Sequence, residues 1–292
     1  MAENRKPFFL SSSELKNVLE QLGQVPRKHH GQNFLHSWPT IERVLDLCAF
    51  RHDDVALEIG PGLGAFTLNI APRVASLHAI ELNHVFAGYV QRAATALTIT
   101  NLEIVVADAL ATEFPPSTTA VFSAMPYSIS APLTFKILEF LRQRRARAYV
   151  ICQKEFGTKL VAPPGSSGYG RLSANASLLA DVMILMEISR NNFYPVPEVD
   201  SVLVKIVPRM DIDEKAANAC LNLTRGLFPY KNKVLRKAMA MHVANKALHG
   251  FPGEILDTMP FKERRVRELD RNALVVLARW YVDRLNKAGK NG

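Results

Sequence analysis

A glycine-rich turn directly after an apolar run constrains the fold of this chain more than any other feature. Residues 55–67 read VALEIGPGLGAFT: a β-rich run enters a turn that contains Gly60, Gly62 and Gly64, and a helical pattern follows. Glycines let a backbone turn sharply and approach a ligand closely, at the carboxyl end of a first parallel strand where α/β sheets bind ligands. The spacing GxGxG, with Glu58 two residues before the first glycine, differs from GxGxxG and disfavours a nicotinamide cofactor.

Strand and helix patterns alternate from about Val55 to Pro208 and predict a doubly wound α/β fold. Segments long enough for crossover helices separate the first five predicted strands, which is typical of a parallel sheet covered on both faces. The last two strands flank a proline-rich loop, FYPVPEVDS, and are expected to form a terminal antiparallel pair. The seven predicted strands are 55–59, 77–82, 103–107, 120–123, 148–153, 183–188 and 202–207. We expect a seven-stranded, mostly parallel sheet with one reversed strand.

After Pro208 the chain becomes helical and basic. Residues 213–247 and 263–287 carry apolar side chains at spacings of three and four, with Lys and Arg between them, and predict amphipathic helices separated by a loop at 250–260. The whole chain has a net charge of +9, and residues 210–292 hold 16 Lys and Arg against 9 Asp and Glu, or +7. Charge concentrated in this way indicates a polyanionic partner, and a nucleic acid is favoured over a membrane surface. The alternative is that the charge only keeps the protein soluble.

Composition limits the class of protein. Hydrophobic residues make up 48% and charged residues 22% of the chain, as in globular proteins. No apolar run reaches the roughly 18–20 residues that span a bilayer, and MAENRKPFFL lacks a secretory signal, so we expect no membrane partner and a cytoplasmic location. The three cysteines, Cys48, Cys152 and Cys220, are scattered, which argues against a disulfide framework and a zinc site. We expect no metal and, because no apolar stripe is left unassigned, a monomer.

Acidic residues end successive predicted strands around the glycine turn. Glu81 lies about 20 residues after the turn, where a carboxylate accepts hydrogen bonds from a ribose diol. Asp108 ends the next strand, where it could accept a hydrogen bond from an adenine amine. Each acid alone could be a loop or cap residue. Together with Glu58 they describe a site for an adenosine-containing cofactor without a pyrophosphate, and S-adenosylmethionine fits best.

Four motifs, one of which contains the glycine turn, occur in this order along the chain. They are HGQNFL at 30–35, EIGPGLG at 58–64, AMPY at 124–127 and FYPVPEVDS at 193–201, and GYGRLS at 168–173 accompanies them. The set resembles the small-subunit ribosomal RNA adenine dimethyltransferases, from about Arg27 to the C-terminus. The resemblance implies a Rossmann-like, S-adenosylmethionine-binding methyltransferase domain at 27–209. It also implies a helical, basic RNA-binding domain at 210–292, with residues 1–26 as an N-terminal extension.

The resemblance implies a specific reaction. Members of this family move methyl groups from S-adenosylmethionine to N6 of two adjacent adenosines near the 3′ end of small-subunit rRNA during ribosome biogenesis. The expected partner is therefore small-subunit rRNA or a small-subunit precursor. By motif position Asn33 and Leu35 would close over the cofactor, and Gly60, Glu81 and Asp108 would hold its methionine, ribose and adenine parts. The other cofactor-binding candidates are Gln32, Glu58, Gly62, Gly64, Leu82, Ala109 and Ala124.

The AMPY motif would serve the adenine. An exocyclic adenine amine is a poor nucleophile because its lone pair is delocalised into the ring, so acceptors for its hydrogens and in-line positioning are needed. The family usually supplies an Asn side chain and a backbone carbonyl in the pattern N-[LI]-P-Y, and its aromatic stacks on the flipped base. Here Pro126 shapes the loop, Tyr127 matches the aromatic, and Phe193 or Tyr194 would supply a second stacking face.

Ala124 departs from the family pattern, because the side-chain acceptor is missing. Losing such a positioned group commonly costs on the order of 10²–10³ in rate. A backbone carbonyl could suffice, or the alanine could be an engineered substitution. Otherwise the chain is a paralogue that has lost dimethylation, changed its acceptor or kept only a ribosome-binding role. The alternative function is thus a non-catalytic, RNA-binding assembly factor, whereas the basic helical region disfavours a small-molecule methyltransferase.

Basic residues of the C-terminal region are the candidates for phosphate contact. They are Arg225, Lys231, Lys233, Arg236, Lys237, Arg264 and Arg265, with Lys262 and Arg267 close by. A second basic cluster at 142–147 precedes the fifth predicted strand. For any single residue the alternative is a solvated helix face.

Overall fold

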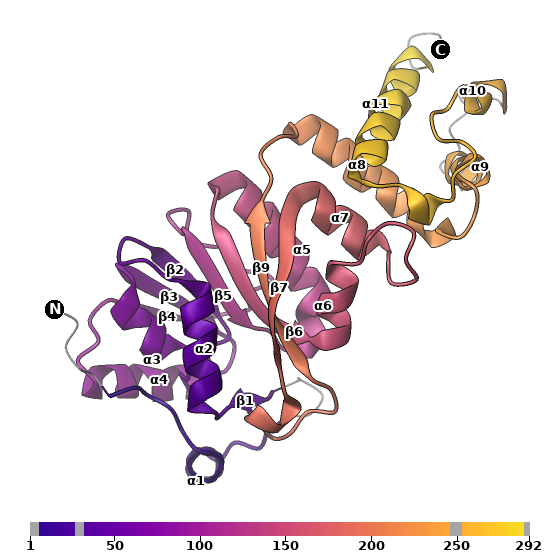
Figure 1. Ribbon diagram of the computed structural model, residues 1–292. Coiled ribbons are helices and arrows are strands. Elements are labelled where there is room, and N and C mark those ends of the chain that lie inside the picture. The colour runs from indigo at the N-terminus through magenta and orange to yellow at the C-terminus, as the bar shows by residue number, and fades with distance from the viewer. Residues whose placement is uncertain (1–5, 27–31, 246–252, 289–292) are drawn as a thin grey trace. The chain divides into compact units, whose positions relative to one another are not determined.

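The computed structural model describes residues 6–26, 32–245 and 253–288 (Figure 1). The chain divides into two compact units. The first unit comprises residues 1–157 and 183–208, and the second comprises residues 158–182 and 209–292. Each unit is described by itself below.

The first unit is built on a seven-stranded sheet with the order β4-β3-β2-β5-β6-β9-β7. In chain order the strands are β2 (Val55–Ile59), β3 (Ser76–Glu81), β4 (Leu102–Val106), β5 (Ala120–Ala124), β6 (Arg147–Gln153), β7 (Ala180–Ile188) and β9 (Ser201–Pro208). Strands β2 to β6 pair in parallel, and β9 is the reversed strand beside β6. The seven predicted strands are confirmed to within one residue at each end, except that β7 begins three residues earlier.

A second, two-stranded sheet was not predicted. It pairs β1 (Phe34–Leu35) with β8 (Phe193–Tyr194) in antiparallel register, so that Phe34 lies opposite Tyr194 and Leu35 opposite Phe193. The sequence separation of these strands hides the pairing from any local pattern. The pairing brings the QNFL motif and the FYPVPEVDS loop side by side.

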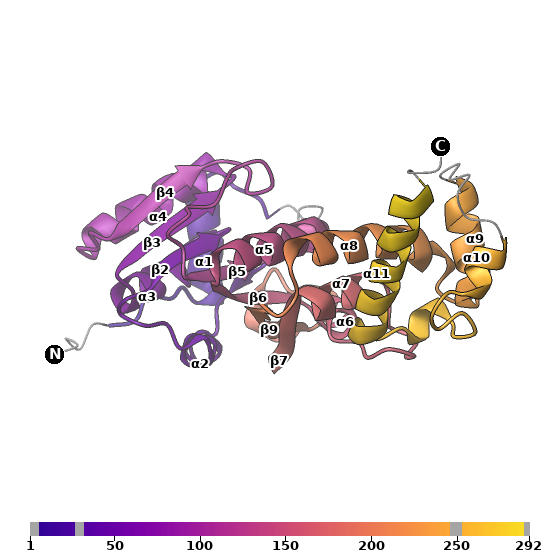
Figure 2. The same cartoon turned by 90° about the horizontal axis from the view of Figure 1, so that it is seen from above.

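Helices cover both faces of the large sheet. α2 (Trp38–Cys48) and α3 (Thr67–Ile70) share an apolar core with alternate strand residues such as Phe122. α5 (Ser130–Arg144) packs against β6 and β9, and Figure 2 shows it across the sheet from α2. α4 (His84–Ala96) packs against β3 and β4. The remaining helices and 3-10 turns around this sheet are α1 (Ser12–Gln21), η2 (Ala71–Arg73), η3 (Tyr127–Ile129), α6 (Lys154–Leu160) and η4 (Arg190–Asn192).

The connection from β4 to β5 differs from expectation. The pattern predicts a crossover helix there, but residues 107–119 form turns and irregular structure. The segment EFPPSTT explains this, because its two adjacent prolines lack N–H donors and clash with a preceding helical turn. With no helix from this connection, Glu103 and Val105 on the edge strand stay exposed.

The second unit is helical. Its elements are α7 (Arg171–Leu179), α8 (Glu214–Leu227), η5 (Phe228–Tyr230), α9 (Leu235–Asn245), α10 (Gly253–Asp257), η6 (Val266–Glu268) and α11 (Arg271–Ala288). The predicted helical stretch 213–247 is therefore two helices separated at Pro229, and its last residues lie outside the described part. The second predicted helix begins at Arg271 rather than at 263. At this start, Asp270 accepts a hydrogen bond from the Ala273 N–H at 2.8 Å. The expected loop at 250–260 contains α10.

Residues 158–182 belong to the second unit, whereas the sequence analysis placed them with the sheet. Two buried hydrogen bonds account for this. Thr224 Oγ1 on α8 donates to Asn175 Oδ1 on α7 at 2.7 Å, and the Tyr169 hydroxyl donates to the Leu269 carbonyl at 2.7 Å. Both bonds join residues far apart in the chain, which a local pattern cannot reveal. The first unit ends at Pro208, one residue before the boundary expected from the sequence.

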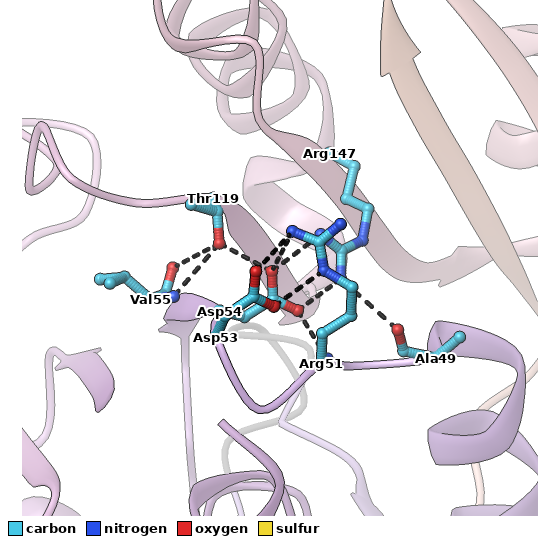
Figure 3. A network of polar contacts seen from close by, with 7 residues as sticks. All are labelled: Ala49, Arg51, Asp53, Asp54, Val55, Thr119 and Arg147. Carbon is cyan, nitrogen blue, oxygen red and sulfur yellow. Dashed lines mark hydrogen bonds and ion pairs between the residues drawn. The ribbon is translucent and has the colours of Figure 1, made fainter. Parts of the chain in front are cut away.

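A buried carboxylate ties together the amino ends of three central strands (Figure 3). Asp54, which has no exposed surface and directly precedes β2, accepts hydrogen bonds from Arg147 Nη1 at 2.9 Å and Thr119 Oγ1 at 2.8 Å. Arg147 begins β6 and Thr119 directly precedes β5. The backbone N–H of Arg51 donates to the same carboxylate at 2.7 Å, in the turn between α2 and β2. This network, here called the Asp54 cluster, holds the three strands in register. It also occupies Arg147, a member of the predicted basic cluster at 142–147.

The Asp54 cluster predicts a pH-dependent contribution to stability. Burial alone would raise the pKa of Asp54, but the hydrogen bonds from Arg147, Arg51 and Thr119 outweigh it and lower that pKa. A carboxylate of this kind stabilises the fold above its unfolded pKa of about 3.9, and the contribution is lost as the pH falls through the lower folded pKa. We predict that Asp54→Ala lowers the free energy of unfolding by about 3 kcal/mol at pH 7, measured by urea titration.

The matched control is Asp53→Ala, which removes a neighbouring carboxylate that is 76% exposed and pairs with Arg51. Its effect should stay within about 0.5 kcal/mol. The cost of Asp54→Ala should shrink when the titration is repeated at about pH 2.5. An equal cost at both pH values would contradict the assigned role of the carboxylate.

Candidate active site

The candidate site lies where β2, β3 and β5 end at one edge of the sheet. In the register of these strands, Ile59 lies opposite both Ile80 and Ser123. Residues that follow these positions therefore emerge together: the glycine turn after β2, Glu81 on β3 and Ala124 on β5. The carboxyl edge of a parallel sheet is the usual place for a ligand in this type of fold.

The glycine turn has the backbone geometry that only glycine adopts easily. Gly60, Gly62 and Gly64 have φ of +79°, +57° and +84°. A Cβ on Gly60 would meet nothing within 4 Å, so its backbone faces open space. A Cβ on Gly62 would lie 3.2 Å from the Phe34 ring, and one on Gly64 would lie 3.1 Å from Leu68. Gly60 thus leaves room for a ligand, whereas the other two permit close packing of β1 and α3.

Glu81 is a buried carboxylate held at the end of β3. One of its oxygens accepts the Gly62 N–H and the other accepts the Asn83 N–H, each at 2.9 Å. Burial raises the pKa of Glu81, and these two hydrogen bonds oppose that shift. Asn83 also caps α4, because its Oδ1 accepts the Val85 N–H at 2.9 Å. The carboxylate therefore has a fixed orientation between the glycine turn and a helix start.

Glu58 lies inside the sheet and is 1% exposed. Its Oε2 is buried and has no hydrogen-bond partner in the described structure. Burial raises its pKa to about 8, so the group keeps a proton near neutral pH. Glu58 is therefore a neutral group enclosed within the sheet, and it does not line the pocket described next.

A pocket opens between the glycine turn, β1 and the AMPY loop. The space between these elements, including the part open to solvent, is about 850 Å³. The predicted site residues that line it are Gln32, Asn33, Leu35, Gly60, Gly62, Glu81, Ala124, Pro126 and Phe193. The structure therefore brings residues from all four motifs into one pocket.

Phe8, Leu10 and Leu15 also line this pocket, and the sequence analysis missed them by treating residues 1–26 as an extension. A signal was present: Leu15, Val18, Leu19 and Leu22 have helical apolar spacing and predict an amphipathic helix.

Several predicted residues do not line this pocket. Asp108 is exposed, and its Oδ1 accepts the Leu110 N–H at 2.8 Å in a turn after β4. Ala109 beside it is buried, and Leu82 after Glu81 is 68% exposed. The assignment of Asp108 to the adenine, and of Ala109 and Leu82 to the binding of the cofactor, stays a prediction. Gly64 packs against α3 as described.

The AMPY loop is held by contacts to neighbouring strands. The buried Met125 donates its N–H to the Ile151 carbonyl at 3.0 Å. The Tyr127 hydroxyl and Ser201 Oγ share a hydrogen bond of 2.9 Å, which fixes a half-buried ring at the start of β9. The sequence analysis did not single out Ser201, although it ends the FYPVPEVDS motif. Phe193 is only 4% exposed and joins the apolar core, so it is a wall of the pocket with little free ring surface.

These residues fit S-adenosylmethionine. The ligand has a ribose diol and a positively charged sulfur, and the pocket offers the fixed Glu81 carboxylate, the open backbone of Gly60 and apolar walls that include Phe66 and Phe86. Within residues 6–26, 32–245 and 253–288, no three His, Cys, Asp or Glu side chains gather as a metal site would require. No helix in the same ranges is both long and apolar enough to cross a bilayer.

The predicted RNA-binding residues differ in their surroundings. Lys231 Nζ donates to the Tyr169 carbonyl at 3.0 Å, Arg236 pairs with Asp257, and Arg265 Nη1 donates to the Asn232 carbonyl at 2.5 Å. The remaining four, Arg225, Lys233, Lys237 and Arg264, are exposed, and none of them forms an ion pair within the described part of the chain. Three of the predicted residues therefore also have polar partners within the chain, and the Arg264 guanidinium lies 5.2 Å from the centre of the Phe261 ring.

Comparisons with known proteins agree with the site. The sequence model of a family described as "Ribosomal RNA adenine dimethylase" matches residues 23–274. A probable ribosomal RNA small subunit methyltransferase A of Pyrococcus abyssi is 35% identical over 86% of this chain and 90% of its own length. A probable dimethyladenosine transferase of Drosophila melanogaster is 36% identical over 76% of this chain and 72% of its own length.

A solved structure is also similar. The dimethyladenosine transferase of Plasmodium falciparum superposes with a TM-score of 0.76 and 27% identity, covering 88% of this chain and 98% of that one. The resemblance inferred from the four motifs is confirmed. The chain belongs to the ribosomal RNA adenine dimethylase family of S-adenosylmethionine-dependent methyltransferases.

Proposed function

We propose that this chain methylates N6 of two adjacent adenosines near the 3′ end of small-subunit rRNA during ribosome biogenesis. One observation carries the proposal: the predicted cofactor residues Gly60 and Glu81 line the same pocket as Ala124 and Pro126 of the AMPY loop. A cofactor and a target base bound at these two motifs would therefore lie next to each other. The family to which the chain belongs performs this type of reaction.

The residues on the cofactor side of the pocket would bind and orient S-adenosylmethionine. S-adenosylmethionine supplies a methyl group on a positively charged sulfur, which a nucleophile can accept. Glu81 would accept hydrogen bonds from the ribose hydroxyls, and the backbone at Gly60 would approach the methionine part. Asn33, just before β1, and Leu35, within it, would close over the ligand, and the surrounding apolar side chains would shield the bound ligand from water. A dry pocket strengthens the hydrogen bonds that the buried carboxylate makes.

The adenine side would position the amine. Tyr127 would stack on the flipped base, and its hydrogen bond to Ser201 fixes the plane of the ring. Ala124 offers no side-chain acceptor, so we infer that backbone carbonyls of the AMPY loop accept the amine hydrogens. In-line positioning of the two substrates supplies the rest of the rate.

The alternative function, a non-catalytic assembly factor, receives no support from the comparisons, whose named relatives are methyltransferases and transferases. Ala124 is the sequence feature that favours it. A cytoplasmic location and a monomeric state stay predictions.

The first experiment measures transfer of labelled methyl from S-adenosylmethionine to small ribosomal subunits that lack the modification, followed by nucleoside analysis. We expect N6,N6-dimethyladenosine from the unaltered chain. Ala124→Asn restores a positioned acceptor and should raise the rate, by at most the order of 10²–10³ that such groups contribute. Ala124→Leu is the control, because it adds a side chain without an acceptor and should not raise the rate. Product from Ala124→Asn alone would overturn the proposal in favour of the assembly factor.

A second experiment tests the role proposed for the exposed basic residues. Lys233 and Lys237 are exposed and lie in or just before α9. If both contact phosphate, the double variant Lys233→Glu/Lys237→Glu should bind small-subunit rRNA more weakly, and the slope of log affinity against log salt should fall by about 1.5.

The charge-matched control is Arg43→Glu/Arg92→Glu, which changes two exposed basic residues on α2 and α4. It should leave the salt slope nearly unchanged. An equal decrease in both double variants would mean that overall charge, rather than this helix, determines the binding of rRNA.

A further inference from the structure

The segment before the family's matched region contributes to the cofactor pocket. The match to the family begins at residue 23, yet Phe8, Leu10 and Leu15 line the pocket together with Gly60 and Glu81. Figure 1 shows α1 at the same end of the first unit as β1. Part of the pocket wall therefore comes from residues that precede the region matched by the family model.

The start of this segment is fixed to α3. The Phe8 N–H donates to Asn69 Oδ1 at 3.1 Å, and Asn69 Nδ2 donates to the Phe8 carbonyl at 2.6 Å. Asn69 is 6% exposed, and its Nδ2 also donates to the Ala65 carbonyl at 2.8 Å. Through these two reciprocal hydrogen bonds, the buried Asn69 side chain pairs with the backbone of Phe8 as a neighbouring strand would. The backbone of the segment is therefore fixed in place beside α3.

The helix that follows is tied to the glycine turn. Ser11 and Glu14 form a capping box at the start of α1. Leu15 and Leu19 on its inner face are each 2% exposed and form an apolar cluster with Leu63 of the glycine turn and Phe86 of α4. The helix therefore packs on the two elements that flank Glu81.

A third contact, made by a residue just after the segment and inside the matched region, leads to the same carboxylate. Asn83 Nδ2 donates to Gln24 Oε1 at 2.9 Å, and the Asn83 N–H donates to Glu81 at 2.9 Å. The segment thus contacts the glycine turn, α3 and the start of α4. Of these elements, the glycine turn and α4 border the pocket, through Gly60, Gly62 and Phe86.

We propose that residues 8–15 form an apolar wall of the S-adenosylmethionine site and that Leu10 and Leu15 are binding residues for this cofactor. The proposal rests on the proposed function, because it assigns the ligand of the same pocket. The wall removes apolar surface of the ligand from water and keeps water from the Glu81 carboxylate. Both effects increase affinity for the cofactor without any contact to RNA.

The test is calorimetric titration of S-adenosylmethionine into the full chain and three variants. Leu10→Ala and Leu15→Val remove apolar groups that line the pocket, and we expect Kd to rise about 5- to 10-fold for Leu10→Ala and about 3-fold for Leu15→Val. Val18→Ala is the matched control, because Val18 lies on the same helix and packs in the same apolar cluster without lining the pocket. Its Kd should stay within about 2-fold of the unaltered chain.

The same titration separates the possible failures. Thermal unfolding followed by circular dichroism establishes that each variant is folded at the temperature of the titration. An unchanged Kd in both Leu10→Ala and Leu15→Val would contradict the proposed role of these residues and leave the proposed function intact. The same holds if Val18→Ala raises Kd as much as they do. Absence of binding by the folded, unaltered chain would overturn the proposed function itself. Glu81→Ala serves as the positive control, since removal of a hydrogen-bonded carboxylate should weaken binding by about 10- to 100-fold.

Discussion

The register of the central strands is the constraint on which the rest of this structure depends, and the buried Asp54 carboxylate enforces it. Parallel strands have no hairpin turn to set their register, so the buried apolar pattern and contacts between the strand ends set it. Asp54 joins the amino ends of β2, β5 and β6 through Thr119 and Arg147. A shift of one strand by one residue would move its apolar side chains to the opposite face and would leave a charged group buried without its partner.

The consequence appears at the opposite edge of the sheet. With the amino ends aligned, the glycine turn, Glu81 and Ala124 emerge at one edge and line one pocket. The small β1–β8 sheet then brings the QNFL motif against the FYPVPEVDS loop, with Leu35 opposite Phe193. Backbone pairing thus joins the QNFL motif, which is expected to contact the cofactor, to the FYPVPEVDS loop. The fold brings the candidate site residues together by pairing chain segments that are up to 160 residues apart in sequence.

The sequence predicted those parts of the fold that local patterns encode. The strands around Val55 and Ala120 have apolar runs with polar boundaries, and the glycines at 60, 62 and 64 mark a turn that other residues adopt with difficulty. The sequence could not reveal contacts between distant segments. The bond from Thr224 to Asn175 assigns α7 to the helical unit, and the bonds of Phe8 to Asn69 place the N-terminal segment at the pocket. Nor could a charge count separate Arg147, which stabilises the sheet, from an exposed residue such as Lys237.

The central claim is that the edge formed by β2, β3 and β5 binds S-adenosylmethionine. The most direct measurement is a crystal structure of the chain with S-adenosylhomocysteine, the product that remains after methyl transfer. The account predicts density in the pocket beside Gly60, with the ribose hydroxyls on the Glu81 carboxylate and apolar contacts from Leu10 or Leu15. A ligand bound at another surface, or a ribose that does not contact Glu81, would contradict the account.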